Sequence, residues 1–386
     1  MLSTRSIINP FAGRVAFDRH GVSGLAQGLS GRAPDVGGFL VSADAVRVIP
    51  GTGRTVDGQP LNEIWNGLQE RLAAFNRQSS LLFSLLTFPV DRATEKVGVY
   101  YTPRMEEATE FGRPQKVRLQ YVPRGYPLTH RDISFGYTQE FIDSARGQEI
   151  TSIQAQVEAA WQNVLFGGAL TALFSNTNAT DEDGVVVRRL YNADTEIPPP
   201  YKRTTHDGTH THYLTSGAAF DGTDLNAIEE HLLHHGFGDF GESLVVFANR
   251  VEILLIRALP AFVPASTATR PAIIAGPIVG ATPQNAPGGL AVEGYHGRLT
   301  IVELNDIPAG YLLGLASGGS FATQNVVGYR RHENESIRGL RLIEGPRQNY
   351  PLYDSVYDGY AGFGVRHRGA AVVMQITAGA YTVPTF

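Results

Sequence analysis

Six histidines, gathered in two short motifs, are the residues of this sequence with the clearest potential for chemistry. The motif HDGTHTH carries His206, His210 and His212, and the motif HLLHHG carries His231, His234 and His235. Histidine is the commonest metal ligand in proteins, and residues four apart, such as His231 and His235, share one face of a helix. A metal-dependent hydrolase is therefore one hypothesis for this chain.

A second interpretation of these histidines is favoured. A zinc motif of the HExxH type needs a glutamate directly after its first histidine, whereas Leu232 follows His231. The first motif lies in a polar, turn-rich stretch beside Asp207 and Gly208. We therefore expect solvated or packed histidines and no metal site.

Other catalytic patterns are absent from the sequence. GLASGG (314–319) lacks the spacing of a nucleophile elbow, and GYAGFG (359–364) lacks that of a dinucleotide fingerprint, so both are expected to be turns. The chain has 0 Cys, which excludes disulfides, thiol nucleophiles and cysteine metal sites. The adjacent carboxylates Glu106–Glu107 and Glu229–Glu230 do not face one substrate and are expected on solvated faces. We expect no catalytic residue and no cofactor.

The charged residues are nearly balanced, with a net charge of −5, so the chain is not an obvious polyanion binder. Lys96, Lys116 and Lys202 are its lysines, and arginines make up the rest of its basic residues. Short basic clusters stand at 202–203, 330–331 and 366–368. We expect them to form salt links between subunits, with weak, sequence-independent DNA contact as the alternative.

The length of 386 residues predicts two to three domains at roughly 150 residues each. Hydrophobic residues make up 42% and charged residues 18%, enough for a substantial core, and Gly 43 with Pro 22 indicates many turns. No apolar stretch is long enough to span a membrane, and the first residues lack the pattern of a signal peptide.

Three helices follow from apolar residues at spacings of three and four. The first runs from Leu61 to Phe75, and the longest covers about 150–175, with Gly167 and Gly168 expected to weaken or bend it. The third covers about 224–235, with Thr223 or Asp224 as its cap.

Strands are expected around these helices. Two alternating runs within 92–126 predict a long two-stranded hairpin with a charged tip, which needs a supporting surface because a lone hairpin is marginal in water. The segments 84–90 and 251–259 could each be helix or strand, and 260–289 is expected to be a loop. Further strands are predicted at 243–249, 298–304, 310–317, 325–330, 338–344 and in the AAVVMQI run of 362–377. The plan is α+β.

The order of these elements resembles the major capsid proteins of tailed bacteriophages with the HK97-like fold. DISFGYTQEFIDSA (132–145), followed by the long helix, looks like the lead into that family's spine helix, and the hairpin looks like its E-loop. GYRRHENESIRGLRLIEGP (328–346) and GFGVRHRGAAVVMQI (362–376) are similar to its returning strands.

The resemblance implies a division of the chain into the parts of an HK97-like subunit. These parts are an N-terminal arm (1–58), a helix and connector of the peripheral domain (59–91), the E-loop hairpin (92–126), the peripheral domain with its spine helix at about 150–175 (127–180), an axial domain (181–324), a peripheral return (325–368), and a final strand with the C-terminal residues (369–386).

The resemblance also implies a function. Pentamers and hexamers of this chain would form an icosahedral shell around double-stranded DNA, in a virion assembled in the host bacterial cytoplasm. The implied partners are the chain itself, a portal, a scaffolding protein, possible decoration proteins and non-specifically contacted DNA, with no membrane. Some family members cross-link subunits through a lysine in the E-loop, but Lys96 and Lys116 flank the hairpin rather than occupy its tip, so we expect non-covalent contacts. An encapsulin-like compartment and a phage fibre or decoration protein are the remaining alternatives.

Overall fold

The computed structural model describes residues 54–77, 80–99, 107, 110, 112, 120–201, 204–217, 219–239, 241–265, 292–349 and 352–386. The described residues form two compact units. Unit 1 contains those up to Arg71 together with those of Ile133–Ala155 and Leu342–Tyr357. Unit 2 contains those of Leu72–Asp132, Gln156–Arg341 and Asp358–Phe386. The predicted arm (1–58), the hairpin tip and the 260–289 loop lie largely outside the described residues.

Unit 1 has a core between two helices and a strand. Helix α3 (Leu61–Arg77) and helix α6 (Gly147–Phe174) begin in this unit, and the Gln154 side chain of α6 donates to the Leu68 carbonyl of α3 at 3.0 Å. The Trp65 ring of α3 meets the Tyr137 ring of strand β4 (Thr129–Thr138) edge to face at 6.1 Å. The buried residues that share this core are Leu61, Ile64, Trp65, Leu68, Tyr137, Ile142 and Ile150.

A sheet runs along β15 (Leu352–Val365). Its strand order is β1-β13-β15-β14, and β4 also pairs with β15. The other strands are β1 (Thr87–Val90), β13 (Val327–Arg330) and β14 (Arg341–Asn349). The short helix α4 (Leu81–Leu86) precedes β1, α5 (Gln139–Ser144) follows β4, and η1 (Glu335–Ile337) lies between β13 and β14. The segment 84–90 is thus both helix end and strand.

The largest core of unit 2 surrounds a seven-stranded sheet with the order β7-β16-β12-β8-β11-β10-β9. Its strands are β7 (Tyr213–Thr215), β8 (Ser243–Ala248), β9 (Val263–Pro264), β10 (Val292–His296), β11 (Leu299–Glu303), β12 (Tyr311–Ser317) and β16 (Ala371–Gln375). Strand β8 is buried at every position, as its unbroken apolar run SLVVFA predicts. Strand β16 pairs with β12 on one side and with β7 on the other.

Two helices border this sheet. Helix α7 (Gly222–His234) contacts β16 and β12, and a Cβ built on Gly314 of β12 would lie 2.2 Å from the Ile228 side chain. Helix α8 (Arg250–Arg257) follows β8, so the ambiguous segment 251–259 is helical. The cap of α7 is Asp221 rather than the predicted Thr223 or Asp224. Asp221 accepts from the Thr223 N–H at 2.7 Å, and Asp224 completes a capping box.

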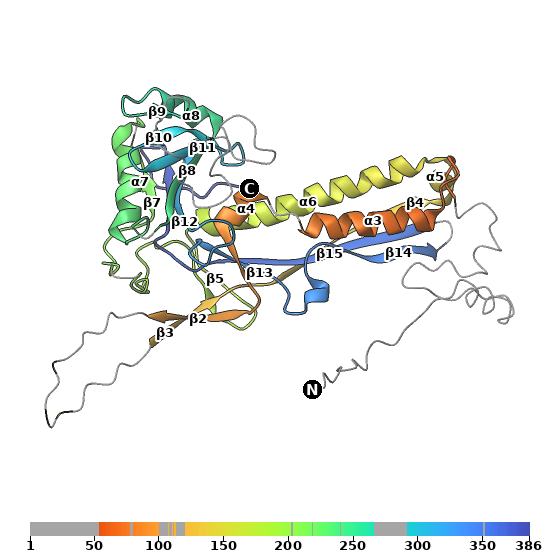
Figure 1. Cartoon of the computed structure of the whole chain (residues 1–386), viewed down its shortest axis with the longest axis horizontal. Coiled ribbons are helices and arrows are strands. Elements are labelled where there is room, and N and C mark those ends of the chain that lie inside the picture. The colour runs from red at the N-terminus through yellow and green to blue at the C-terminus, as the bar shows by residue number, and fades with distance from the viewer. Residues whose placement is uncertain are drawn as a thin grey trace, which may run out of the picture. The chain divides into compact units, whose positions relative to one another are not determined.

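The predicted hairpin is confirmed at its base. Strand β2 (Thr94–Val99) pairs antiparallel with β3 (Gln120–Gly125), with Thr94 opposite Gly125 (Figure 1). A second short hairpin, β5 (Ala179–Thr180) with β6 (Val186–Val187), lies close to β3. The predicted strands of the seven-stranded sheet are confirmed as well, and so is the α+β class.

The long helix predicted at 150–175 is confirmed by α6, which continues through Gly167 and Gly168 instead of ending there. Gly168 has a packing role, because a Cβ at this position would lie 2.3 Å from the Phe363 ring. Gly167 has open space around its Cα. Gly168 therefore allows a close approach of α6 to β15, and the helix is not interrupted at either glycine.

Candidate functional site: the hairpin base and the histidine cluster

The base of the β2–β3 hairpin is anchored by a buried arginine. Arg124 of β3 is fully buried and forms an ion pair with Glu196. Burial lowers the pKa of Arg124, while the adjacent Glu196 carboxylate opposes this shift. Because an arginine stays charged at any ordinary pH, removing Glu196 would leave a buried cation.

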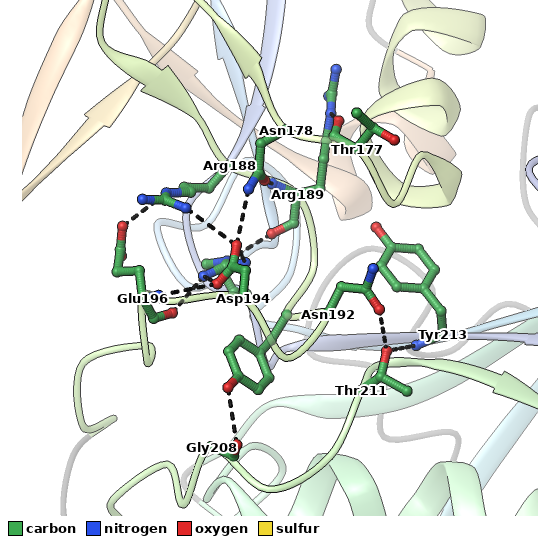
Figure 2. A network of polar contacts seen from close by, with 12 residues as sticks. Thr177, Asn178, Arg188, Arg189, Asn192, Asp194, Glu196, Gly208, Thr211 and Tyr213 are labelled. Carbon is green, nitrogen blue, oxygen red and sulfur yellow. Dashed lines mark hydrogen bonds and ion pairs between the residues drawn. The ribbon is translucent and has the colours of Figure 1, made fainter.

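Glu196 belongs to a larger network of arginines and carboxylates, shown in Figure 2. Arg188 bridges both acids, at 2.8 Å to Glu196 and 3.2 Å to Asp194 (Figure 2). Arg368 donates to both oxygens of Asp194, and the Asn178 amide donates to one of them at 2.9 Å. Burial raises the pKa of Asp194, but the hydrogen bonds from Arg368 and Asn178 outweigh it and lower this pKa to about 2.

The other hairpin strand has its own anchor. Glu95 of β2 accepts from Arg366 at 2.9 Å and from the Tyr126 hydroxyl at 3.0 Å. Burial, followed by the Glu95 charge, raises the pKa of Tyr126 well above its ordinary value. Arg330 donates to the Tyr126 carbonyl at 2.7 Å. Both strands of the hairpin base are therefore fixed to unit 2 by charged contacts.

The basic clusters at 330–331 and 366–368 make ion pairs within this chain, and the links between subunits that we expect from them stay a prediction. Arg330 pairs with Glu182, Arg331 with Asp91 at 3.0 Å, Arg366 with Glu95 and Arg368 with Asp194, all within this chain. Strand pairing in the fold brings carboxylates from distant segments to these arginines, which no local pattern indicates. Lys202 and Arg203 lie outside the described residues.

The two predicted glycine turns are corrected. The segment 359–364 lies inside β15, where a Cβ on Gly359 would lie 2.4 Å from the Trp161 ring and one on Gly362 would lie 1.5 Å from the Pro127 carbonyl oxygen. The segment 314–319 begins inside β12, and the hydroxyl of its buried Ser317 donates to the Leu85 carbonyl at 2.9 Å. These glycines admit close neighbours, and Ser317 is structural.

Of the two carboxylate pairs, Glu229 and Glu230 have different surroundings. Glu229 accepts from the Arg298 N–H at 3.1 Å, whereas Glu230 is exposed. Glu107 is exposed, and Glu106 lies outside the described residues.

The six histidines form one cluster, although they come from two motifs. The loop before β7 brings His206, His210 and His212 against the end of α7, where His235 stacks on His206 with ring centroids 3.9 Å apart. The His210 ring lies 4.8 Å from the His231 ring and 5.4 Å from the His234 ring. Two groups could hold a metal ion, namely His206 with His212 and His235, and His210 with His234 and His235.

The loop that carries three of these histidines is held on the body of unit 2. Tyr191 donates from its hydroxyl to the Gly208 carbonyl at 3.0 Å, and Thr211 donates to the Asn192 side chain at 2.8 Å (Figure 2). The backbone N–H of His212 donates to the Tyr191 carbonyl at 2.8 Å. The cluster is therefore supported by the segment that carries Asp194.

Burial and mutual repulsion keep the inner histidines neutral. Burial, followed by the charge of neighbouring histidines, lowers the pKa of His206 to about 4 and that of His235 to about 3. The same causes lower the pKa of the fully buried His212 well below its ordinary value. At neutral pH each of these imidazoles therefore keeps one unprotonated ring nitrogen.

No helix among the described residues is long and apolar enough to span a membrane. No known family profile matches the sequence, and no curated protein matches it either.

Solved structures do match this chain. A structure from Mycobacterium phage Patience is 35% identical, covers 86% of this chain and 93% of that chain, and has a TM-score of 0.62. The capsid of the native GTA particle is 14% identical, with coverage of 78% and 91% and a TM-score of 0.45. The holo-SrpI encapsulin complex from Synechococcus elongatus PCC 7942 is 13% identical, with coverage of 90% and 99% and a TM-score of 0.42.

Proposed function

Because this chain belongs to the major capsid proteins of tailed bacteriophages with the HK97-like fold, we propose that its copies form pentamers and hexamers that close into an icosahedral shell around double-stranded DNA. Its role is that of a structural subunit of the virion. The ring sizes, the enclosed DNA and the absence of enzymatic activity are the parts that we propose beyond membership of the family. The encapsulin-like alternative is weaker, because the 35% identical relative comes from a phage.

The observation that carries this proposal is the 35% identity with the Mycobacterium phage chain, maintained over 93% of that chain. A likeness of this extent covers both units, so it supports the whole shell subunit rather than a single shared domain. The predicted parts, from the arm at 1–58 to the final strand in 369–386, belong to the same proposal.

The hairpin supports a role between subunits. A two-stranded hairpin is marginal by itself, yet Arg124 and Glu95 fix the base of this one to its own subunit. A base fixed by charged contacts can transmit force from a tip that lies over a neighbour. We therefore assign 92–126 the role of an E-loop that clamps an adjacent subunit.

Helix α8 offers a second contact surface. Val251, Leu254 and Leu255 are 56%, 59% and 47% exposed, whereas Ile253 and Ile256 on the opposite side are buried. The exposed face lies in the predicted axial domain (181–324). We assign this face to contact with a second copy of the chain in the same ring, because heterologous ring contacts bury different surfaces on the two sides of each subunit.

The charge distribution supports weak contact with the packaged DNA. The net charge is −5, and Arg330, Arg331, Arg366 and Arg368 are engaged by carboxylates of the same chain. A wall of this kind encloses DNA without binding it strongly. A portal, a scaffolding protein and decoration proteins are the other proposed partners, with assembly in the host bacterial cytoplasm.

Non-covalent contacts between subunits are a further part of this proposal. Lys96 is exposed on β2, in register with Pro123 at the base of the hairpin rather than at its tip. Lys116 lies outside the described residues. We assign the subunit contacts to non-covalent burial multiplied by symmetry.

Size-exclusion chromatography and negative-stain microscopy of the purified full-length chain test this function. Closed particles of megadalton size with five-fold and six-fold capsomers are the expected result. A monomer, dimer or trimer under conditions in which a scaffolding protein is supplied would contradict it. Particles filled with a cargo enzyme instead of DNA would favour the encapsulin-like alternative.

A further inference from the structure

We propose that His206, His212 and His235 form a binding site for one divalent transition-metal ion, with Zn²⁺ as the best chemical match. One ring nitrogen of each residue lies within 4.8 Å of those of the other two. Two nitrogens bound to the same tetrahedral zinc ion are separated by about 3.3 Å, given zinc–nitrogen bonds of about 2.05 Å. The rings of His206 and His235 are stacked parallel with centroids 3.9 Å apart, so at least one ring must turn about its side-chain bonds for the three lone pairs to converge on one ion.

The three histidines are buried and carry unsatisfied nitrogens. Their exposed fractions are 6% for His206, 0% for His212 and 3% for His235. Among the described residues, His206 Nε2, His212 Nε2 and His235 Nδ1 have no hydrogen-bond partner. Buried polar atoms are normally paired, so three unpaired nitrogens in one cluster point to a ligand that all three share.

His212 is oriented for metal binding. Its Nδ1–H donates to the Ala371 carbonyl at 2.8 Å, which leaves the lone pair on Nε2. A backbone carbonyl that holds the second ring nitrogen is the usual support of a metal-binding histidine. The same bond ties the site to strand β16.

The proton of His235 is positioned by an acid at the edge of the cluster. Asp207 Oδ1 lies 3.3 Å from His210 Nδ1, and His210 Nε2 lies 2.8 Å from His235 Nε2. A proton on Nδ1 of His210 and another on Nε2 of His235 satisfy both contacts. The lone pair of His235 is then on Nδ1, its unpaired buried atom.

His206 requires one rearrangement. Its Nδ1 accepts from the Gly208 N–H at 3.1 Å, so in the neutral ring the proton is on Nε2. Metal binding at Nε2 moves this proton to Nδ1, and the bond from Gly208 is exchanged for a metal–nitrogen bond. Gly208 has φ +73 and no Cβ, which lets the loop adjust to this exchange.

The donor set selects the class of ion. Three neutral imidazoles without a carboxylate among them suit Zn²⁺ and its borderline neighbours, whereas Mg²⁺ and Ca²⁺ prefer oxygen ligands. A cavity of about 520 Å³ is lined by His206 and His235 and gives the ion a route to the site. A bound ion would join the loop before β7 to the end of α7, a structural clamp that does not depend on shell assembly.

Metal analysis of the full-length chain tests the site. The protein is stripped with EDTA, dialysed against Zn²⁺ and then against buffer, and its zinc is counted by mass spectrometry. One Zn²⁺ per subunit is expected for the wild type, and loss of that equivalent for His212→Gln and His235→Gln. Co²⁺ in place of Zn²⁺ should give the visible absorption of a tetrahedral complex.

Two control variants identify the ligands. His234→Ala and His332→Ala should keep the full equivalent, since neither belongs to the buried group. Far-UV circular dichroism in EDTA shows whether each variant folds. Should the glutamine variants not fold, X-ray absorption of the zinc-loaded wild type must show three imidazole ligands. Substoichiometric zinc in the wild type, retention by both glutamine variants, or loss on His234→Ala with retention on His212→Gln would overturn the proposal.

Discussion

Arg368 holds Asp194 through two parallel hydrogen bonds, from Nη1 to Oδ1 at 2.9 Å and from Nη2 to Oδ2 at 2.6 Å. The same guanidinium donates to the Arg189 and Glu196 carbonyls at 2.9 and 2.7 Å. A single buried side chain therefore fixes the segment that presents Glu196 to Arg124. The stability of the hairpin base depends on this pair.

Acid should weaken the Arg368–Asp194 pair. The pKa of Asp194 is about 2 in the folded chain, against an ordinary 3.8, so its charged form stabilises the fold above about pH 4. As the pH falls from about 4 to about 2, this contribution, about 2 kcal/mol, is lost. Unfolding of unassembled subunits in urea at several pH values measures it. The Asp194→Asn variant should show a smaller loss over the same range, and an identical pH dependence in both proteins would contradict the assignment.

The two partners of the Arg124–Glu196 pair should respond unequally to substitution. Glu196→Gln leaves Arg124 buried without its carboxylate and should cost about 3 kcal/mol of unfolding free energy. Arg124→Met replaces a buried charge with an apolar chain and should cost less, because Glu196 keeps its contact with Arg188 at 2.8 Å. Urea unfolding of the two variants makes the comparison. A greater loss for Arg124→Met would show that the network does not depend on the carboxylate.

The two adjacent glycines of α6 form a matched pair. Gly167→Ala adds a methyl group in open space and should stabilise the helix by about 0.5–1 kcal/mol. Gly168→Ala places that methyl group 2.3 Å from Phe363 and should destabilise the subunit. Thermal unfolding should therefore shift in opposite directions for the two variants. Equal shifts would mean that helix propensity alone governs both positions.

Deletion of residues 105–115 should separate folding from assembly. The base of the hairpin is fixed by Arg124 and Glu95, so the shortened subunit should keep the circular dichroism spectrum of the wild type. Its yield of closed shells should fall by an order of magnitude or more, because symmetry multiplies each lost contact. Electron microscopy counts the shells. Complete and stable heads built from the deleted protein would show that the hairpin is not a clamp.

A charge on the exposed face of α8 should have a similar effect through a different surface. Leu254 is 59% exposed, so Leu254→Glu should change the unfolding free energy by less than about 0.5 kcal/mol. A buried charge in a ring contact should nevertheless lower the shell yield strongly. Asn226→Glu, at an exposed position of α7, is the control and should assemble normally. Normal assembly of Leu254→Glu would remove α8 from the proposed interface.

Sequence periodicity predicted the elements whose signal is local. The stripe from Leu61 to Leu72 and the run at 150–175 became α3 and α6, because a single buried face gives a helix its period. The continuous apolar run of β8 was equally clear. Periodicity also predicted the base of the hairpin, because apolar and polar residues alternate in both of its strands, on either side of a polar stretch.

Strands β4 and β15 gave no usable signal. Every position of β4 except Tyr137 is exposed or half-buried, and such a strand has no apolar alternation. Strand β15 contains Gly359, Gly362 and Gly364, which predict turns but admit Trp161, Pro127 and Gly125 at close range. Packing decided both elements, and packing is not a local property.

The candidate site was predictable in its parts but not in its assembly. Both histidine motifs were evident, and His231 and His235 share a helix face by spacing alone. Their approach to His206 depends on where the loop before β7 crosses the end of α7, which is set by the pairing of β7 with β16. The glycine at 236, with φ +81, ends α7 beside that loop and was the one local sign of the turn.

Strand β16 lies inside the seven-stranded sheet, between β7 and β12. Strand β16 is the last strand of that sheet to be synthesised. Strands β7 and β12 therefore stay unconnected until Ala371–Gln375 have emerged from the ribosome. A chain that stops short of this point exposes the edges of β7 and β12 and lacks the partner that joins them. A product truncated before Ala371 therefore cannot complete the fold of the subunit.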